Sequence, residues 1–209
     1  MSKGHLLVLI GPSGCGKGTV LKEVLRLSPH TFYSVSATTR PPREGEVNGK
    51  HYYFISEADF HAMIKDDGLL EYARYVGNYY GTPRDAVMKR LDAGENVILE
   101  IEVQGAKQIR EKFPEAVLLF ILPPSIKELQ CRLIGRHTEA AEAVDARLER
   151  AKEELEFASE CDYIIINDVV ETAAGKICSV IESLSCRAVD MKETIQNILN
   201  NKCEWGELS

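Results

Sequence analysis

No stretch of this sequence is apolar for long enough to cross a membrane. The 209-residue chain has no run approaching the roughly 18 apolar residues that a transmembrane helix needs. Its first residues also lack the charged segment, apolar segment and small-residue cleavage site of a secretory signal peptide. We therefore expect a cytoplasmic protein with no membrane partner.

The cysteines are irregularly placed. The chain has six cysteines and no C-x-x-C pair, so the sequence indicates neither a zinc site nor a disulfide framework. We expect free thiols in a reducing compartment. The six are Cys15, Cys131, Cys161, Cys178, Cys186 and Cys203.

Basic residues are also in deficit. Lys and Arg number 25 against 32 Asp and Glu, and the net charge of −7 argues against a broad surface for nucleic acid or anionic lipid. Any anion that the protein binds must therefore be held by a local cluster of cations. With 44% hydrophobic residues at this length, the chain is expected to form one domain with a substantial core.

Short apolar runs alternate with helical patterns along most of the chain. The runs are unbroken and rich in Val, Ile and Leu, which is typical of strands buried on both faces of a parallel sheet. They lie at 5–10, 96–101, 116–122 and 162–167, and the main helices are predicted at 17–27, 103–113, 125–134 and 170–184. This pattern predicts a doubly wound α/β fold, a parallel sheet wrapped by helices.

Two segments interrupt the alternation and are interpreted as insertions. The first has short strand-like pieces around one predicted helix, with Ser56 as its cap and Asp59 as its third residue. The second is densely charged with a narrow apolar stripe, and insertions at strand ends often serve as lids. We expect one domain over 1–209: a core of about 1–36, 91–125 and 158–187, an insert of about 37–90, a lid of about 126–157, and a tail of about 188–209 that forms a helix and a frayed end.

A glycine-rich segment between the first strand and the first helix is a candidate phosphate-binding loop. Such loops have the pattern G-x-x-x-x-G-K-[ST]; Gly11, Gly16 and Lys17 match it, while Gly18 stands in the Ser/Thr place and Thr19 follows. Backbone N–H groups and the helix N-terminus attract phosphate, and Lys17 adds a full positive charge. The candidate ligands are Gly11, Pro12, Ser13, Gly14, Cys15, Gly16, Lys17, Gly18 and Thr19, with Cys15 interpreted as a small packed side chain.

Two arginines of the insert form a second candidate anion site. Arg40 and Arg43 stand three residues apart in "SVSATTRPPR", beside prolines that stiffen the chain, so two guanidinium groups can be aimed at one phosphate. For either arginine alone, a solvated surface charge is the alternative. Farther along are "HYYF", "EYA" and "NYYGTPRDAV", where Thr82 has the position of a helix N-cap before Pro83, with Asp85 as the third helical residue.

Together with "LEIEVQGA" and "GRHTE", these separated motifs resemble those of guanylate kinases over about residues 6–184. The resemblance implies a P-loop NTPase core with a GMP-binding insert and a helical lid, and ATP and GMP as substrates. It implies that GMP is bound by Ser36, Arg40, Arg43, Tyr52, Glu71, Tyr80, Thr82 and Glu102. It adds Arg132, Arg136 and Asn167 to the ATP side, and its catalytic residues are Lys17, Arg40, Arg43, Arg136 and Arg147.

We expect carboxylate and hydroxyl groups to recognise the guanine base. Guanine offers N1–H and an amine as donors, so we expect Glu71 to accept both while Ser36 and Thr82 donate to O6. The alternative is that Glu71 pairs with a nearby lysine at a strand end. Alternation along a strand predicts that Glu100 and Glu102 point the same way, although the family usually has aspartate in place of Glu102.

The resemblance also implies Mg²⁺, held mainly by ATP phosphates and water, with Thr19 and Glu100 as candidate protein ligands. Arg150, in contrast, is interpreted as a surface charge paired with neighbouring glutamates. The sequence leaves the oligomeric state open between monomer and dimer.

Two other functions remain open at this point. One is a non-catalytic guanylate-kinase-like module that binds phosphorylated peptides, which would have no use for Lys17 and its loop. The other is a kinase for another nucleoside monophosphate or a small phosphorylated sugar. That function would leave Ser36, Glu71 and Thr82 unexplained together.

Overall fold

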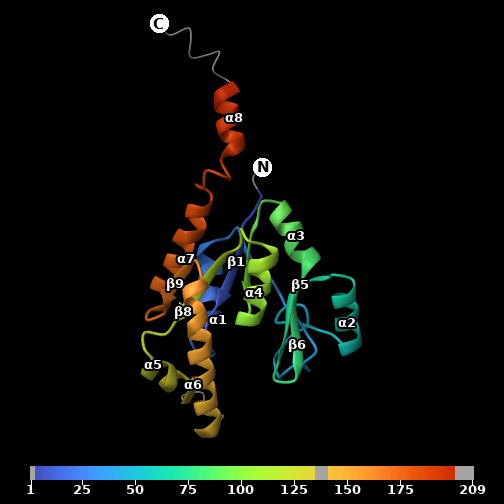
Figure 1. Ribbon diagram of the computed structural model, residues 1–209, viewed down its shortest axis with the longest axis vertical. Coiled ribbons are helices and arrows are strands. Elements are labelled where there is room, and N and C mark those ends of the chain that lie inside the picture. Colours follow the sequence, from blue (N-terminus) through green and yellow to red (C-terminus); the bar gives the residue numbers. More distant parts are fainter. Residues whose placement is uncertain (1–2, 135–140, 201–209) are drawn as a thin grey trace.

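The core is a five-stranded parallel sheet. The computed structural model describes residues 3–134 and 141–200. Every pairing between neighbouring strands of this sheet is parallel, so the doubly wound sheet predicted from the sequence is confirmed. In spatial order, the strands are β2 (Thr31–Tyr33), β7 (Asn96–Glu100), β1 (Leu6–Ile10), β8 (Val117–Leu122) and β9 (Tyr163–Ile166) (Figure 1).

Burial on both faces explains why the strands are unbroken apolar runs. In β1, Leu7 and Leu9 belong to one hydrophobic cluster, whereas Leu6, Val8 and Ile10 belong to another. Successive side chains of a strand point to opposite faces, so each cluster lies on its own side of the sheet. A sheet covered on both sides requires an apolar residue at every position of its central strands.

Helices cover the two faces. Helices α1 (Lys17–Leu27) and α7 (Val170–Leu184) pack on one face, and both match their predicted bounds. Helices α3 (Arg84–Asp92) and α4 (Val103–Lys112) and the 3₁₀ turn at Phe157–Glu160 pack on the other (Figure 1). The prediction for α4 was one residue too long.

A second sheet lies between β2 and β7 in the sequence. Its four strands run in the order β4 (Tyr53–Phe54), β3 (Ala37–Thr38), β6 (Asn78–Pro83) and β5 (Leu69–Tyr75), and helix α2 (Glu57–Lys65) packs Phe60 against them. Ser56 caps α2 as predicted. Its Oγ accepts from the Asp59 N–H at 3.1 Å and donates to the Asp59 carboxylate at 2.6 Å.

Thr82 does not cap α3, contrary to the prediction. Strand β6 continues through Thr82 to Pro83, and α3 begins at Arg84 with no side-chain cap, so Asp85 is its second residue. The Thr82 hydroxyl is buried and donates to Glu71 at 2.6 Å. A tertiary partner inside the second sheet has replaced the local capping bond.

Three further helices of the described residues extend from the core. Helix α5 (Ile126–Ile134), predicted one residue longer, packs against α6 (Ala141–Glu156) through Leu129, Leu133 and Ala151. Helix α8 (Lys192–Asn200) projects beyond α7 and confirms the helix predicted in the tail, whereas the predicted frayed end lies outside the described residues (Figure 1). Among the helices of the described residues, none has the length and apolarity to span a membrane.

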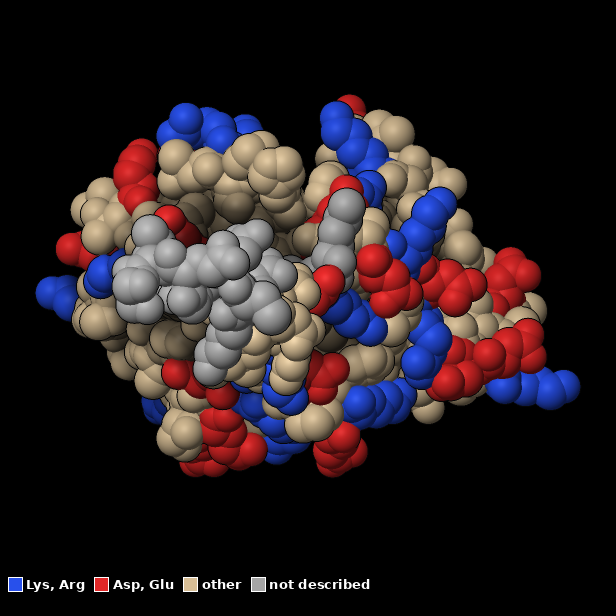
Figure 2. Space-filling view, turned by 90° about the horizontal axis from the view of Figure 1, so that it is seen from above, with Lys and Arg blue, Asp and Glu red and all other residues tan. Residues whose placement is uncertain are grey.

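Basic and acidic side chains are mixed on the face shown in Figure 2. There, the described Lys and Arg residues are interspersed with Asp and Glu and form no single large basic area. This distribution fits the net charge of −7.

Candidate active site

The candidate active site lies where the core strands end. The glycine loop follows β1, Glu100 ends β7, and Asn167 follows β9. Because the strands are parallel, their carboxyl ends meet at one edge of the sheet, where ligands bind in open α/β sheets. The Asn167 side-chain amide donates to the Cys15 carbonyl at 2.8 Å, so the end of β9 is tied directly to the loop.

The loop leaves the N-terminus of α1 uncapped by any side chain. Gly16 precedes the helix with a φ of +90°, a left-handed conformation that favours glycine, and the first turn carries no acidic residue. A Cβ at Gly16 would also collide with the Asn167 amide. Uncapped N–H groups at the positive end of a helix dipole form an anion-binding site.

Lys17 supplies the full positive charge of this loop. Its Nζ donates to the carbonyl oxygens of Gly11 at 2.6 Å and Pro12 at 3.3 Å. Among the described residues it forms no ion pair, so its charge is available to a phosphate. Cys15 is fully buried and burial raises the pKa of its thiol, which confirms the interpretation of a packed, neutral side chain.

A cavity of about 440 Å³, the loop cavity, opens beside this helix start. It is lined by Gly14, Gly16, Thr19, Arg132, Asn167, Asp168 and Val170, which include five candidates for the ATP side. The Arg132 guanidinium donates one hydrogen bond to the Glu128 carboxylate at 2.9 Å and another to the Asn167 backbone carbonyl at 3.2 Å. The side-chain Oδ1 of Asn167 is buried and has no hydrogen-bond partner within the described part of the chain.

A second cavity of about 350 Å³, the insert cavity, is lined by both the loop and the four-stranded sheet. It contains Lys17 and Glu100 from the core. It also gathers seven of the eight expected GMP ligands: Ser36, Arg40, Arg43, Tyr52, Glu71, Tyr80 and Glu102. The eighth, Thr82, contacts Glu71 instead of lining the cavity.

Glu71 is a buried carboxylate in the wall of the insert cavity, with 3% of its surface exposed. Its Oε1 accepts from Thr82, and its Oε2 lies against the α-carbon of Gly105 in α4, where a Cβ would overlap it. Burial raises the pKa of Glu71 to about 7, partly opposed by Thr82 and Lys112. No lysine ion pair to Glu71 is found in the described residues; Lys112 donates to the Leu70 carbonyl at 3.0 Å.

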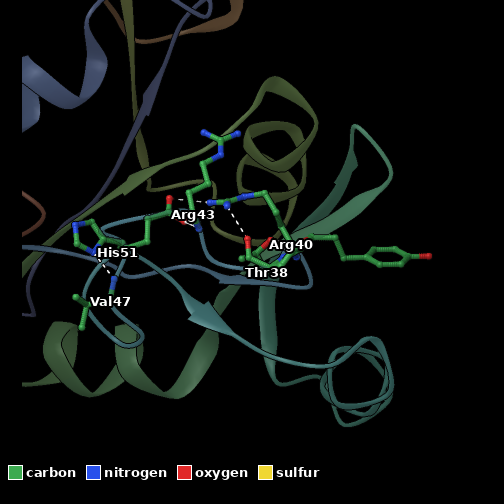
Figure 3. Close-up of polar contacts among 8 residues, drawn as sticks. Thr38, Arg40, Arg43, Val47 and His51 are labelled. Carbon is green, nitrogen blue, oxygen red and sulfur yellow. Dashed lines mark hydrogen bonds and ion pairs between the residues drawn. The ribbon is translucent and has the colours of Figure 1, made fainter. Parts of the chain in front are cut away.

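Glu46 organises the two arginines of the insert and was not singled out from the sequence. Its Oε1 accepts from Arg40 at 2.9 Å and its Oε2 from the Arg43 backbone N–H at 2.7 Å, and these bonds lower the pKa of Glu46 to about 2. Arg40 also lies over the rings of Tyr52 and Phe54, at 5.5 and 5.7 Å. The guanidinium of Arg43 extends away from this network (Figure 3). The signal that could have pointed to Glu46 is an acidic residue three positions after an arginine in a loop.

Tyrosines form an aromatic wall of the insert cavity. Tyr80 contacts Tyr52 and Tyr75 edge to face, with centroid distances of 5.9 and 6.3 Å. Burial raises the pKa of Tyr52, so its hydroxyl remains a donor. Tyr75 was missed in the sequence, although alternation along β5 places it on the same face as Glu71. Tyr33 also lines the cavity and had no signal of its own.

Glu100 and Glu102 both line the insert cavity, as alternation predicted, although β7 ends at Glu100 and Glu102 lies just before α4. Burial raises the pKa of Glu100; Lys17 opposes this rise and Glu102 adds to it. Within residues 3–134 and 141–200, no group of three or more His, Cys, Asp or Glu could hold a metal ion. The two candidate magnesium ligands line different cavities: Thr19 lines the loop cavity, and Glu100 lines the insert cavity.

The lid arginines are described only in part. Arg136 and the side chain of Arg147 lie outside the described residues. Arg150 pairs with Glu154 one turn farther along α6, at 3.1 Å, which confirms the predicted ion pair. Arg150 also reaches Glu102 at 3.4 Å and lies over the Tyr75 ring at 4.3 Å, so it is more than a surface charge.

An uncapped glycine loop with a lysine, at the carboxyl edge of a parallel sheet, is the arrangement of P-loop nucleotide-binding proteins. Here the same lysine also lines a cavity that holds two arginines. Two anion sites that share one lysine define a P-loop phosphotransferase, an enzyme that brings two phosphorylated substrates together.

Comparison with known proteins identifies the family. The family model described as guanylate kinase matches residues 3–184. A guanylate kinase from Desulfitobacterium hafniense (strain Y51) is 51% identical over 184 residues, 88% of this chain and 92% of its own length. One from Nostoc sp. (strain PCC 7120 / SAG 25.82 / UTEX 2576) is 54% identical over 174 residues, 83% of this chain and 87% of its own. The crystal structure of guanylate kinase from Anaplasma phagocytophilum matches with a TM-score of 0.77 at 31% identity, covering 93% of this chain and 94% of that one. The chain belongs to the guanylate kinase family.

Proposed function

We propose that this protein transfers the γ-phosphoryl group of ATP to GMP, giving ADP and GDP. The observation that carries the proposal is the buried carboxylate of Glu71 in a cavity that also contains Lys17 and two arginines. One carboxylate accepts both donors of the guanine edge, whereas adenine would face it with the N1 lone pair. The cavity therefore offers complementary groups to guanine and to phosphate.

In this proposal the acceptor phosphate is held by Arg43 and Arg40. Arg43 is the more accessible of the two guanidinium groups, and Glu46 orients Arg40. Tyr52 and Tyr80 add hydroxyl donors. Because the Thr82 hydroxyl already donates to Glu71, we assign the donor to guanine O6 to Ser36.

The proposed ATP site is the loop and the loop cavity. Loop N–H groups and Lys17 bind the phosphates, and the unpaired Oδ1 of Asn167 is an acceptor for the adenine amine beside Arg132. By family resemblance, Arg136 and Arg147 neutralise the transferred group. Magnesium bound to the ATP phosphates would supply further positive charge there. Glu100 with Thr19 suits an ion that is coordinated chiefly by phosphates and water.

The chemistry requires little covalent assistance from the protein. The attacking oxygen belongs to the GMP phosphate and is already anionic, so no general base is needed. Catalysis then consists of placing the acceptor oxygen in line with the γ-phosphorus and neutralising charge. Lys17 lines the insert cavity and its Nζ donates to the Gly11 carbonyl of the loop, so its charge lies between the two proposed phosphate sites.

The two alternatives are less well supported by the site. A phosphopeptide-binding module gives no reason for the uncapped loop and Lys17, and another monophosphate kinase gives none for the buried pair of Glu71 and Thr82. We place the enzyme in the cytoplasm, since the five described cysteines are all free thiols, as expected in a reducing compartment.

The test is an assay of ADP formation with ATP and magnesium, offering GMP, AMP, CMP, UMP or no acceptor. We expect rapid ADP formation with GMP and at most a small rate in the other reactions. Equal rates in all reactions would indicate an ATPase and contradict the proposal. No ADP in any reaction, together with binding of a phosphopeptide, would favour the binding module.

A further inference from the structure

One side chain of helix α6 reaches the wall of the insert cavity. The Arg150 guanidinium lies 4.3 Å from the centroid of the Tyr75 ring and 3.4 Å from Glu102, and both partners line that cavity. We call these two contacts the Arg150 bridge. Figure 1 shows α6 and the β5–β6 hairpin extending from the same end of the molecule. The bridge thus joins the predicted lid helix, the core and the four-stranded sheet through one residue.

The tight turn after β5 fixes the position of Tyr75. Tyr75 pairs with Asn78 across the hairpin, and the two residues between them have left-handed backbones: φ is 45° at Val76 and 79° at Gly77. Two positive φ values in a two-residue loop are the mark of a type I′ turn, which holds the strand register. A β-branched residue such as Val76 rarely adopts this conformation. The register that it maintains keeps Tyr75 on the face of β5 that carries Glu71.

Arg150 also separates two carboxylates at the edge of the cavity. It pairs with Glu102 on the core side and with Glu154 on its own helix. Burial raises the pKa of Glu154 and the charge of Glu102 raises it further, so the two carboxylates repel each other. Without the guanidinium, that repulsion would act between α6 and the core, and the local charge would become more negative where two anionic substrates must bind.

Ring contacts continue from the Arg150 bridge toward the proposed phosphate site. Tyr75 packs edge to face on Tyr80 at 6.3 Å, Tyr80 packs on Tyr52 at 5.9 Å, and Tyr52 lies under Arg40 at 5.5 Å. Contiguous packed side chains of this kind can carry a displacement from one site to another. An acceptor that orders Tyr52 and Tyr80 would therefore also order the ring on which Arg150 rests.

We propose that Arg150 is a positioning residue that couples occupancy of the acceptor site to the placement of helix α6. The inference rests on the proposed function, because it takes GMP as the occupant of the insert cavity. Arg150 acts through Tyr75 and Glu102 and does not touch the reacting atoms. A guanidinium suits this position because it stacks on a ring and binds a carboxylate at once, which a lysine ammonium does less well.

The test is a double-mutant cycle between Arg150 and Tyr75, measured as kcat/KM for GMP at saturating ATP. Arg150→Gln is expected to lower kcat/KM at least fivefold, the combined size of a cation–π contact and an exposed ion pair. Tyr75→Leu is expected to lower it at least about twofold, because it removes the cation–π contact alone. The kcat/KM of the double variant should be no more than about twofold below that of the less active single variant, because both changes remove the same contact. Arg150→Lys should fall between Arg150→Gln and the unaltered enzyme.

Two measurements separate this role from a structural one. The affinity for an unreactive ATP analogue without GMP should stay within about twofold in Arg150→Gln, and the unfolding temperature should fall by no more than about 4 °C, the shift expected from losing exposed contacts of this size. Lys152→Ala is the matched control, because Lys152 lies on the same helix and pairs only with Glu149 among the described residues, at 2.6 Å.

Multiplying effects in the double variant, or unchanged kcat/KM in Arg150→Gln, would overturn the inference. Equal losses of ATP-analogue affinity and GMP use would overturn it too. Failure of the unaltered enzyme to form GDP would instead reject the proposed function.

Discussion

The carboxylate of Glu71 lies against the α-carbon of Gly105, and a Cβ on that glycine would overlap Glu71 Oε2. The two residues come from different parts of the fold, since Glu71 is in β5 of the second sheet and Gly105 is in α4 of the core. Gln108, one turn farther along α4, holds the backbone of Tyr72 with two hydrogen bonds, of 2.7 and 3.2 Å. The core helix therefore fixes the side chain that we propose reads guanine.

Gly105→Ala is expected to lower kcat/KM for GMP at least tenfold, because the added methyl group displaces the Glu71 carboxylate. The affinity for an ATP analogue should stay within about twofold. Gly175→Ala in α7 is the matched control, since its new Cβ would meet no atom within 4 Å. Both changes favour helix by up to about 1 kcal/mol, so loss of activity only in Gly105→Ala isolates the contact with Glu71. Equal activity of the two variants would show that the carboxylate can move without consequence.

Glu71→Gln is expected to reduce GMP use by at least tenfold, because one acceptor oxygen becomes an NH₂ donor facing the donors of guanine. Binding of an ATP analogue should change by less than about twofold. Steady-state kinetics with GMP and a titration of the analogue measure the two effects. Unchanged GMP kinetics would remove Glu71 from the guanine pocket.

The raised pKa of Glu71 predicts a pH dependence of GMP use. Its pKa of about 7 means that the carboxyl becomes protonated below neutrality, so kcat/KM for GMP should fall as the pH drops below about 7. Glu71→Gln should lack that part of the profile. Any decline that persists in the variant belongs to another group, such as the GMP phosphate itself.

The same shift predicts how stability changes with pH. A carboxyl whose pKa is raised by folding from 4.5 to about 7 binds more protons in the native state, so its contribution is full below pH 4.5 and is lost as the pH rises through about 7. As the pH rises from 5 to 8, the unfolding temperature of the unaltered protein should therefore fall relative to that of Glu71→Gln. A constant difference over that range would contradict the assigned pKa.

Lys17→Met is expected to lower kcat at least 10²-fold, because the loop loses its one full positive charge. Among the described residues its ammonium donates to two loop carbonyls and to no other group, so circular dichroism and the unfolding temperature should show an intact fold. A folded variant with near-normal turnover would mean that Lys17 does not act on the transferred phosphate.

Local patterns in the sequence were sufficient for much of this protein. Unbroken apolar runs predicted the buried parallel strands, helical periodicity placed α1 and α7, and the Ser56 cap placed the start of α2. The glycine loop and its lysine were visible because the pattern occupies eight consecutive residues, from the end of β1 into the first turn of α1. Each of these features depends on neighbours within a few positions along the chain.

Only the tertiary structure decided which side chains meet across the site. Thr82 had the local position of a helix cap, but the pairing of β5 with β6 placed its hydroxyl on Glu71. Arg150 had glutamates nearby in its own helix, but the packing of α6 also brought it to Tyr75 and Glu102. The physical reason is that these contacts join residues from separate elements, whose relative placement follows from burying the shared core and not from any period or cap in the sequence.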